Sequence, residues 1–286
     1  MEENTPKTRR TLIGSILLWV IVPLVLGSLT ALLISRPVIG IITLRDSIYA
    51  YTAENLIKQI EYARENENIA AVVLVLESPG GTVVHTEAIY LELLALRKEK
   101  PLVVSIDGMA ASGAYYLTAA ADYAFAKPTS MVGNIGVIGM LPDAPIIFEN
   151  IISTGPYKLW GSPRDTYMRQ IETIKQAFYE VVRGGRGERL KAKTDVVLSG
   201  QIWPATTAYQ LGLIDELGSQ TQAVEKAAEM AGVRNYKTQD LSIFASSSTN
   251  APYGFFAQSE NGTLLPYPKE AGIYLLYIPP MQAGQK

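Results

Sequence analysis

The sequence of 286 residues contains no cysteine and only one histidine, His85. Without cysteine the chain can form no disulfide, and it offers no thiol nucleophile and no thiolate ligand for a metal. With one histidine, a triad of serine, histidine and aspartate would have to use His85. This residue falls in the first turn of an expected helix, where a place on the helix face explains it. We expect neither a metal ion nor a cofactor.

Charge is also scarce. Only 18% of the residues are charged, and the formal net charge is −2. The basic residues are scattered apart from one short cluster at the N-terminus, so the composition gives no electrostatic reason to expect nucleic acid as a partner. The apolar share of 48% is enough to fill the core of one compact domain.

One long stretch, over residues 11–35, lacks charged residues altogether. A helix that crosses a bilayer needs about 20 predominantly apolar residues, which this stretch provides. Three basic residues lie at positions 7–10, whereas only Arg36 follows closely. The excess of positive charge before the stretch predicts a cytoplasmic N-terminus over 1–10 and a single-pass signal anchor over 11–35 in the cell membrane, with the remainder extracytoplasmic. A cleaved signal peptide is the alternative, although the apolar core is longer than usual and no clean cleavage site follows it.

After this stretch, short runs rich in β-branched residues alternate with segments of helical periodicity. Strands are expected at 38–44, 70–76 and 102–106. Helices are expected at 52–64, at 84–98, through 171–181 with an end near 184–185, and at 220–231. A helix between consecutive strands favours an α/β core with a largely parallel sheet. The segment 236–286 lacks periodicity and is expected to be an irregular tail.

Two glycine-rich loops follow consecutive expected strands. In the first, the adjacent Gly80 and Gly81 allow backbone conformations closed to other residues and can direct bare N–H groups at a ligand oxygen. In the second, Ser112 lies among small residues and is followed by Gly113 at the start of a helix. Each loop alone is weak evidence, because a serine at such a junction more often caps the helix than attacks a substrate. Together, in this order and spacing, they indicate an oxyanion hole beside a serine.

The sequence also resembles a known family, on the motifs ESPGGTV, GMAASGAYYLTAAADYAFAKP, VGNIGVIG, YKLWGSP and AYQLGLIDELGS. These motifs are similar to those of the serine peptidases typified by signal peptide peptidase A, within the Clp protease and crotonase fold group. The resemblance implies a peptidase domain over 38–235, with repeated ββα units around a largely parallel sheet, preceded by one transmembrane helix.

The resemblance also implies roles for the residues of the two loops. In the family the serine of the A-A-S-G motif attacks the peptide carbonyl, which corresponds to Ser112. The oxyanion hole corresponds to Gly81 and Gly113, and Gly80 shapes the turn.

The general base of the family is a lysine, and the matching position is Lys158. Lys127 and Lys175 are competing bases for which solvated roles are expected. A lysine that serves as a base near neutral pH needs its pKa lowered by about three units from about 10.4, which burial against apolar neighbours can achieve. Two departures from the family pattern accompany this assignment. Leu159 replaces an acidic residue, and Asn134 replaces a serine that hydrogen-bonds the catalytic lysine; an amide oxygen can accept the same bond.

These features predict a membrane-tethered, homo-oligomeric serine endopeptidase that cuts unstructured apolar peptides such as cleaved signal peptides. The strand edge beside Gly81 would bind an extended peptide by backbone pairing. A stomatin-partner-type membrane protease is one alternative. Acyl-CoA hydratase or isomerase chemistry on the same fold is another, although it needs neither a lysine base nor an anchor. A catalytically silent scaffold is disfavoured by the intact loops. Asp107, Asp122 and Asp215 lie at element boundaries, where turn and capping chemistry suffices.

Overall fold

The structure is a computed structural model that describes residues 17–33, 36–140, 164–244, 256–258, 264–268 and 270–278, with the single residues 14 and 154. The chain divides into two compact units, Met1–Pro37 and Val38–Lys286. In the first unit a π-helical turn, η1 (Leu17–Ile21), leads into helix α2 (Val22–Leu33). Among the helices in the described ranges, none is both long and apolar enough to cross a membrane. The anchor expected at 11–35 therefore stays a prediction.

A largely parallel sheet forms the centre of the second unit. Its strands are β1 (Val38–Leu44), β2 (Ile69–Ser78), β4 (Leu102–Ala111), β5 (Tyr123–Ala126), β6 (Met131–Gly133), β8 (Ile202–Pro204), β9 (Glu216–Leu217) and β10 (Lys237–Asp240). The spatial order is β10-β1-β2-β4-β5-β9, while β6 pairs with β4 and β8 pairs with β6. Every one of these pairings is parallel except that of β6 with β8. The expected α/β core with a largely parallel sheet is confirmed.

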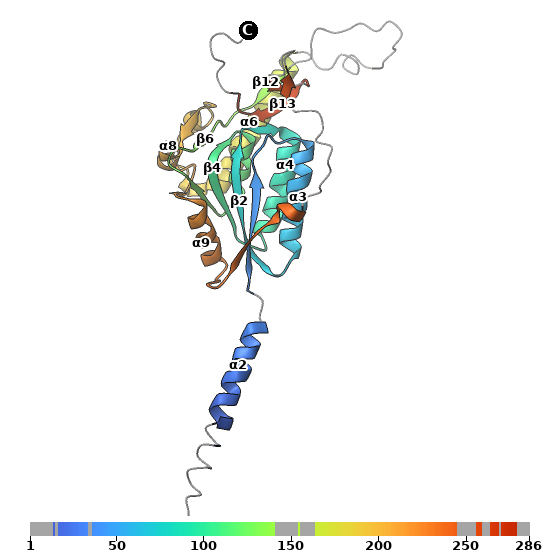
Figure 1. Cartoon of the computed structure of the whole chain (residues 1–286). Coiled ribbons are helices and arrows are strands. Elements are labelled where there is room, and N and C mark those ends of the chain that lie inside the picture. Colours follow the sequence, from blue (N-terminus) through green and yellow to red (C-terminus); the bar gives the residue numbers. More distant parts are fainter. Residues whose placement is uncertain are drawn as a thin grey trace, which may run out of the picture. The chain divides into compact units, whose positions relative to one another are not determined.

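Helices cover both faces of this sheet. They are α3 (Ala50–Glu65), α4 (Val83–Arg97), α5 (Gly113–Thr118), α6 (Arg164–Arg186), α7 (Thr194–Val197), α8 (Ala205–Gln210) and α9 (Gln220–Met230), with the short turns η2 (Gly187–Arg189) and η3 (Leu241–Phe244). Helices α3 and α4 lie on one face, and α9 lies on the other (Figure 1). The helices expected at 52–64, 84–98 and 220–231 are confirmed to within two residues at each end.

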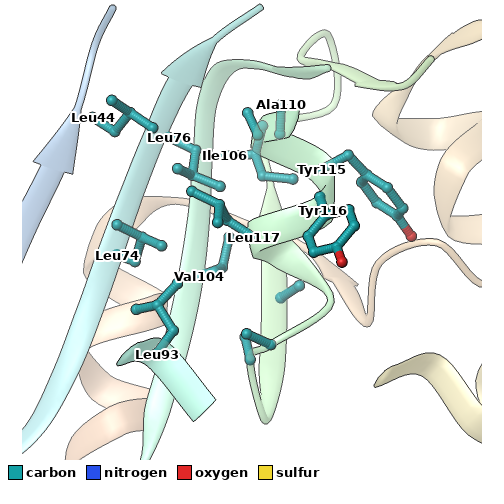
Figure 2. Close-up of a cluster of buried hydrophobic side chains, with 14 of the residues drawn as sticks. Leu44, Leu74, Leu76, Leu93, Val104, Ile106, Ala110, Tyr115, Tyr116 and Leu117 are labelled. Carbon is teal, nitrogen blue, oxygen red and sulfur yellow. The ribbon is translucent and has the colours of Figure 1, made fainter. Parts of the chain in front are cut away.

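The two faces of the sheet are each packed into a separate apolar cluster. In β2, Leu74 and Leu76 face the cluster under α3 and α4, whereas Val73 and Val75 face the cluster under α9. Figure 2 shows Leu74 and Leu76 beside Val104 of β4. All of these side chains are fully buried. Burial on both faces explains why β2 reads as a continuous apolar run and does not alternate with polar residues.

The segment 236–286 differs from the irregular tail that the sequence predicts. Within its described residues, β10 extends the main sheet, and β11 (Phe256–Gln258) pairs with β12 (Leu264–Pro268). A further strand, β13 (Gly272–Leu276), lies between β3 (Gly80–Thr82) and β7 (Ile138–Met140) in a three-stranded antiparallel sheet. The partners of β13 lie far away along the chain, so local periodicity gives little sign of this pairing.

Candidate active site

The two glycine-rich loops meet at one edge of the main sheet. Strands β2 and β4 are parallel neighbours, and Ser78 pairs with Ala110 at their carboxyl ends. Gly80 and Ser112 each follow two residues later, which brings the loops together. A Cβ atom built on Gly80 would lie only 2.5 Å from the backbone nitrogen of Gly113. The juxtaposition expected from the order of strands is therefore present.

The first loop is fixed against the segment that follows β1. The N–H of Ile48 donates to the carbonyl of Gly80, and the N–H of Thr82 donates to the carbonyl of Ile48, both at 2.8 Å. Backbone groups alternate in direction along an extended strand, so the N–H of Gly81 points away from Ile48 and toward the opposite edge. A Cβ atom on Gly81 would lie 1.9 Å from the Ile48 carbonyl oxygen, which leaves room only for glycine.

Ser112 has an unusual backbone conformation at the end of β4. Its φ is 52° and its ψ is −116°, a region that costs a non-glycine residue about 1–3 kcal/mol. The Ser112 N–H donates to the carbonyl of Gly133 at 2.8 Å, and the Ser112 carbonyl accepts from the N–H of Tyr116 at 2.9 Å. These two bonds hold the serine at a sharp turn from strand to helix, as in nucleophile elbows.

The side chain of Ser112 forms no hydrogen bond with the described residues that would explain its place in the fold. It makes no capping bond to α5, which removes the usual reason for a serine at the start of a helix. The residue is only 1% exposed, and its Oγ has no hydrogen-bond partner within the described part of the chain. Since a buried hydroxyl without a partner costs roughly 1–3 kcal/mol, its presence calls for a functional explanation.

Gly113 completes the arrangement. A Cβ atom at this position would lie 2.8 Å from Oγ1 of Thr86 and 3.1 Å from the carbonyl oxygen of Leu275. Its backbone is therefore approached closely from two sides, one of them the C-terminal strand β13. The backbone nitrogen of Gly113 thus lies beside Gly80, the residue that precedes Gly81. That the N–H groups of Gly81 and Gly113 donate to a single oxyanion stays a prediction. Sequence reasoning missed Leu275, although the apolar run GIYLLYI around it is a strand signal.

Asn134 is held by bonds to a neighbouring loop. Its φ is 55°, the other positive value of a non-glycine residue among those described. Its backbone N–H donates to the carbonyl of Gln201, and its Nδ2 donates to the carbonyl of Gly200, both at 2.7 Å. The bond from Nδ2 fixes the orientation of the side-chain amide, whose oxygen is the acceptor available to an ammonium group.

The proposed general base Lys158 lies outside the described residues, so its contact with Ser112 or Asn134 is untested. The two competing lysines are both described and both ion-paired. Nζ of Lys127 lies 3.2 Å from Oδ2 of Asp107, and Nζ of Lys175 lies 2.7 Å from Oε2 of Glu172. These pairings agree with the solvated roles expected for them.

His85 is also engaged elsewhere. Its Nδ1 lies 2.6 Å from Oγ1 of Thr82, within hydrogen-bonding distance. Since Oγ of Ser112 has no partner within the described ranges, the histidine is not hydrogen-bonded to it there. This arrangement agrees with a helix-face role for His85 and gives no support to a triad.

The aspartates at element boundaries serve structural roles. Asp122 accepts from Nε of Arg97 at 2.6 Å and from the N–H of Leu102 at 3.0 Å. Asp215 accepts from both terminal nitrogens of Arg186 at 2.8 Å, and both side chains are almost fully buried. Burial alone would raise the pKa of the Asp215 carboxyl, but the hydrogen bonds and charge of Arg186 outweigh this effect and bring the pKa below its usual value.

Comparisons with known proteins identify relatives of this chain. Residues 95–234 match the family model described as Peptidase family S49, and residues 32–133 match the model described as Clp protease. Protease 4 of Haemophilus influenzae is 32% identical over 209 residues, which cover 66% of this chain and 33% of that protein. A putative protease of Synechocystis is 30% identical over 217 residues, which cover 70% of this chain and 76% of that protein.

The chain spans about a third of the length of the first curated relatives that it matches. Among solved structures, a membrane-bound stomatin-specific protease in complex with a substrate peptide aligns with a TM-score of 0.54 and 16% identity. That alignment covers 76% of this chain and 95% of the other, and it shows a shared fold. Together with the two matched models and the relatives, the loops described above show that this chain belongs to peptidase family S49, the serine peptidases of the signal peptide peptidase A type.

Proposed function

We propose that this chain is a serine endopeptidase with Ser112 as nucleophile and Lys158 as general base. The observation that carries the proposal is the hydroxyl of Ser112, which is buried and lacks a hydrogen-bond partner within the described residues. Its backbone is held in a sparsely populated conformation beside Gly113. A buried serine that lowers stability in these two ways and does not cap the helix is expected to take part in catalysis.

The reaction would proceed through an acyl-enzyme. Oγ of Ser112 attacks the carbonyl carbon of the scissile bond, and the hydroxyl proton passes to the neutral amine of Lys158. The carbonyl oxygen becomes negative and accepts hydrogen bonds from the N–H groups of Gly81 and Gly113, each worth about 10²–10³ in kcat. The C–N bond then breaks, and the lysine returns its proton to the leaving amine. Water, deprotonated in turn by the lysine, hydrolyses the ester and regenerates the serine.

Membership of the family supports a proposal for the substrate class. Unstructured apolar peptides, such as signal peptides left in a bilayer, would bind in extended form by backbone pairing with the strand edge beside Gly81. An anchor over 11–35 would hold the catalytic unit at the extracytoplasmic face of the cell membrane, close to such peptides. The uncharged stretch and the preceding basic residues support this placement.

Hydrolysis of an internally quenched, leucine-rich peptide by the detergent-solubilised full chain tests the proposed roles. Ser112→Ala should lower kcat on the order of 10⁴- to 10⁶-fold, because the nucleophile is lost. Lys158→Ala should lower it to a similar extent, because residues that act as one unit are not additive. Ser130→Ala is a matched control: Ser130 is another buried serine, but its Oγ donates to the carbonyl of Ile106 at 2.9 Å. Its loss should reduce stability and leave kcat within a few-fold of wild type.

Alanine variants of the two competing lysines test whether Lys158 is the general base. Lys127→Ala and Lys175→Ala should both retain activity, because each amine is already paired with a carboxylate. If Lys158→Ala stays active while one of these variants is inert, the general base is misassigned. Activity that persists in Ser112→Ala would reject the proposal itself.

We also propose a homo-oligomer in which the serine and the lysine can come from different protomers. Mixing the inactive Ser112→Ala and Lys158→Ala chains tests this arrangement, because one mixed site would then carry both intact residues. Restored hydrolysis after mixing supports a site shared between protomers. Two inert chains that stay inert in a demonstrated mixed oligomer would show that each protomer uses its own pair.

A further inference from the structure

The C-terminal strand β13 lies where an extended peptide would have to bind. It pairs antiparallel with β3 on one side, where Leu275 is opposite Gly81, and with β7 on the other, where Ile273 is opposite Gly139. Beyond its end, the N–H of Tyr277 donates to the carbonyl of Pro79 at 2.8 Å. Strand β13, coloured red, is found at the end of the domain that carries the site loops (Figure 1). It is thus the middle strand of a sheet whose edges belong to the segments around the site.

The register of β13 brings one of its carbonyl groups to the oxyanion donors. The N–H of Gly81 points toward β13, because the neighbouring carbonyl and N–H groups of β3 are bonded to Ile48 on the other edge. The Leu275 carbonyl oxygen lies 2.1 Å from the position of a Cβ atom on Gly80 and 3.1 Å from that on Gly113. The carbonyl of Leu275 therefore occupies the place of a substrate carbonyl, and the bond from Leu275 to Leu276 occupies the place of a scissile bond.

The side chains of β13 support the same register. Leu275 is fully buried and belongs to the main apolar cluster, and Leu276 and Tyr274 are 3% and 5% exposed. Ile273 packs against the same cluster while partly exposed. A leucine side chain is thus buried in the apolar cluster close to the site loops, as expected for the residue before a scissile bond in an apolar peptide. A sheet binds an extended peptide by backbone pairing along a strand edge, and β13 is paired in this way on both of its edges.

We propose that β13 is a built-in substrate mimic: the chain's own C-terminal strand fills the peptide groove between β3 and β7, with Leu275 in the pocket before the scissile bond. The proposal rests on the proposed function and adds its regulation. A substrate must displace β13 before it can reach Ser112. The apparent dissociation constant is the intrinsic constant divided by the fraction of molecules whose groove is open, so a groove filled nine-tenths of the time weakens substrate binding about tenfold.

The first test measures activity in variants that should release β13 from the groove. Leu275→Asp in the full chain places a charge in the apolar pocket, so β13 should leave the groove. We expect kcat/KM for a short quenched leucine peptide to rise about tenfold. Ile243→Asp is the matched control, since Ile243 is another apolar residue of the C-terminal segment but is 70% exposed. This control should leave kcat/KM unchanged. Leu275→Ala, which removes less and adds no charge, should raise kcat/KM by a smaller factor and serves if the aspartate variant does not fold.

A second test needs no catalysis. Hydrogen exchange of residues 272–277 is measured in the full-chain Ser112→Ala variant, with and without an isotope-labelled synthetic peptide that has the sequence of residues 270–278. We expect the peptide to accelerate exchange in that segment about tenfold by displacing it. The same peptide with aspartate in place of the leucine at its sixth position, which corresponds to Leu275, should have no effect.

The outcomes separate the two proposals. Displacement of β13 without hydrolysis by any variant supports the mimic and overturns the peptidase. Hydrolysis that depends on Ser112, together with unchanged kcat/KM in both Leu275 variants and unchanged exchange on adding peptide, overturns the mimic and leaves the peptidase standing.

Discussion

Replacing Gly81 with alanine tests whether the N–H of this residue is a donor of the oxyanion hole. A methyl group at this position would lie 1.9 Å from the carbonyl oxygen of Ile48 and 2.6 Å from the Ile48 carbonyl carbon and nitrogen. All three atoms are backbone atoms, so no side-chain rotation relieves the clash. Strand β3 has to move away from Ile48, and the N–H of Gly81 moves with it.

The structure allows both effects to be estimated. Moving β3 weakens the hydrogen bonds that join Ile48 to Gly80 and Thr82, which at about 0.5–1.5 kcal/mol each amounts to about 1–3 kcal/mol of stability. Misplacing one oxyanion donor should lower kcat by about 10²–10³-fold. The loss of the donor itself should appear in kcat, because it acts mainly in the transition state, while the shift of β3, one edge of the proposed groove, should appear in KM. Peptide hydrolysis and denaturant unfolding of Gly81→Ala measure the two effects.

Gly136→Ala is the control for that experiment. A methyl group on Gly136 would have Cα of Gly200 as its nearest atom, at 3.7 Å, which is an ordinary contact. This variant should keep both activity and stability close to wild type. If Gly81→Ala retained a wild-type kcat and a wild-type unfolding midpoint, the assignment of Gly81 to the oxyanion hole would be refuted.

Two further predictions concern stability. In α6, Gly184→Ala should stabilise the chain by about 0.5–1 kcal/mol, because within the described residues no atom other than the adjoining helix backbone lies within 4 Å of the new methyl group. Gly185→Ala should destabilise the chain by about 1–3 kcal/mol, because its methyl group would lie 2.1 Å from the carbonyl oxygen of Ala119. Equal shifts in urea unfolding would contradict this contrast. Asp215→Asn should cost about 3–5 kcal/mol at pH 7, since it leaves the buried Arg186 without a charged partner. The folded carboxyl has a lowered pKa, so its contribution is present above about pH 4 and is lost as the pH falls through that lower pKa. The difference from wild type should therefore shrink on acidification, and a difference that grows would contradict it.

The part of the fold that the sequence predicts well has strong local patterns. The buried runs of β1, β2 and β4 are continuous and apolar because both faces of the sheet are covered, and helical periodicity marks α3 and α4 between them. Once the strands are parallel, their carboxyl ends meet at one edge. The meeting of Gly80 with the loop of Ser112 then follows without knowledge of any long-range contact.

The remainder depends on contacts that local patterns do not encode. The backbone of Ser112 is held by the carbonyl of Gly133 in β6, and the side chain of Asn134 by the carbonyl of Gly200, both in other segments. Strand β13 is short, and its partners in β3 and β7 precede it by more than a hundred residues. A sequence read in local windows therefore detects the loops but neither the geometry of the serine nor the pairing of β13 with β3 and β7.

The backbone of Ser112 is strained even when no ligand is bound. The backbone would relax if the residue turned toward an ordinary helical or extended conformation, but its N–H is tied to Gly133 and its carbonyl to Tyr116. A bound molecule that forms a hydrogen bond with the Ser112 hydroxyl removes part of the free-energy cost of burying this group. Its binding therefore raises the free energy of unfolding of the whole chain. Occupancy of the site and resistance to unfolding are thus coupled through a single side chain.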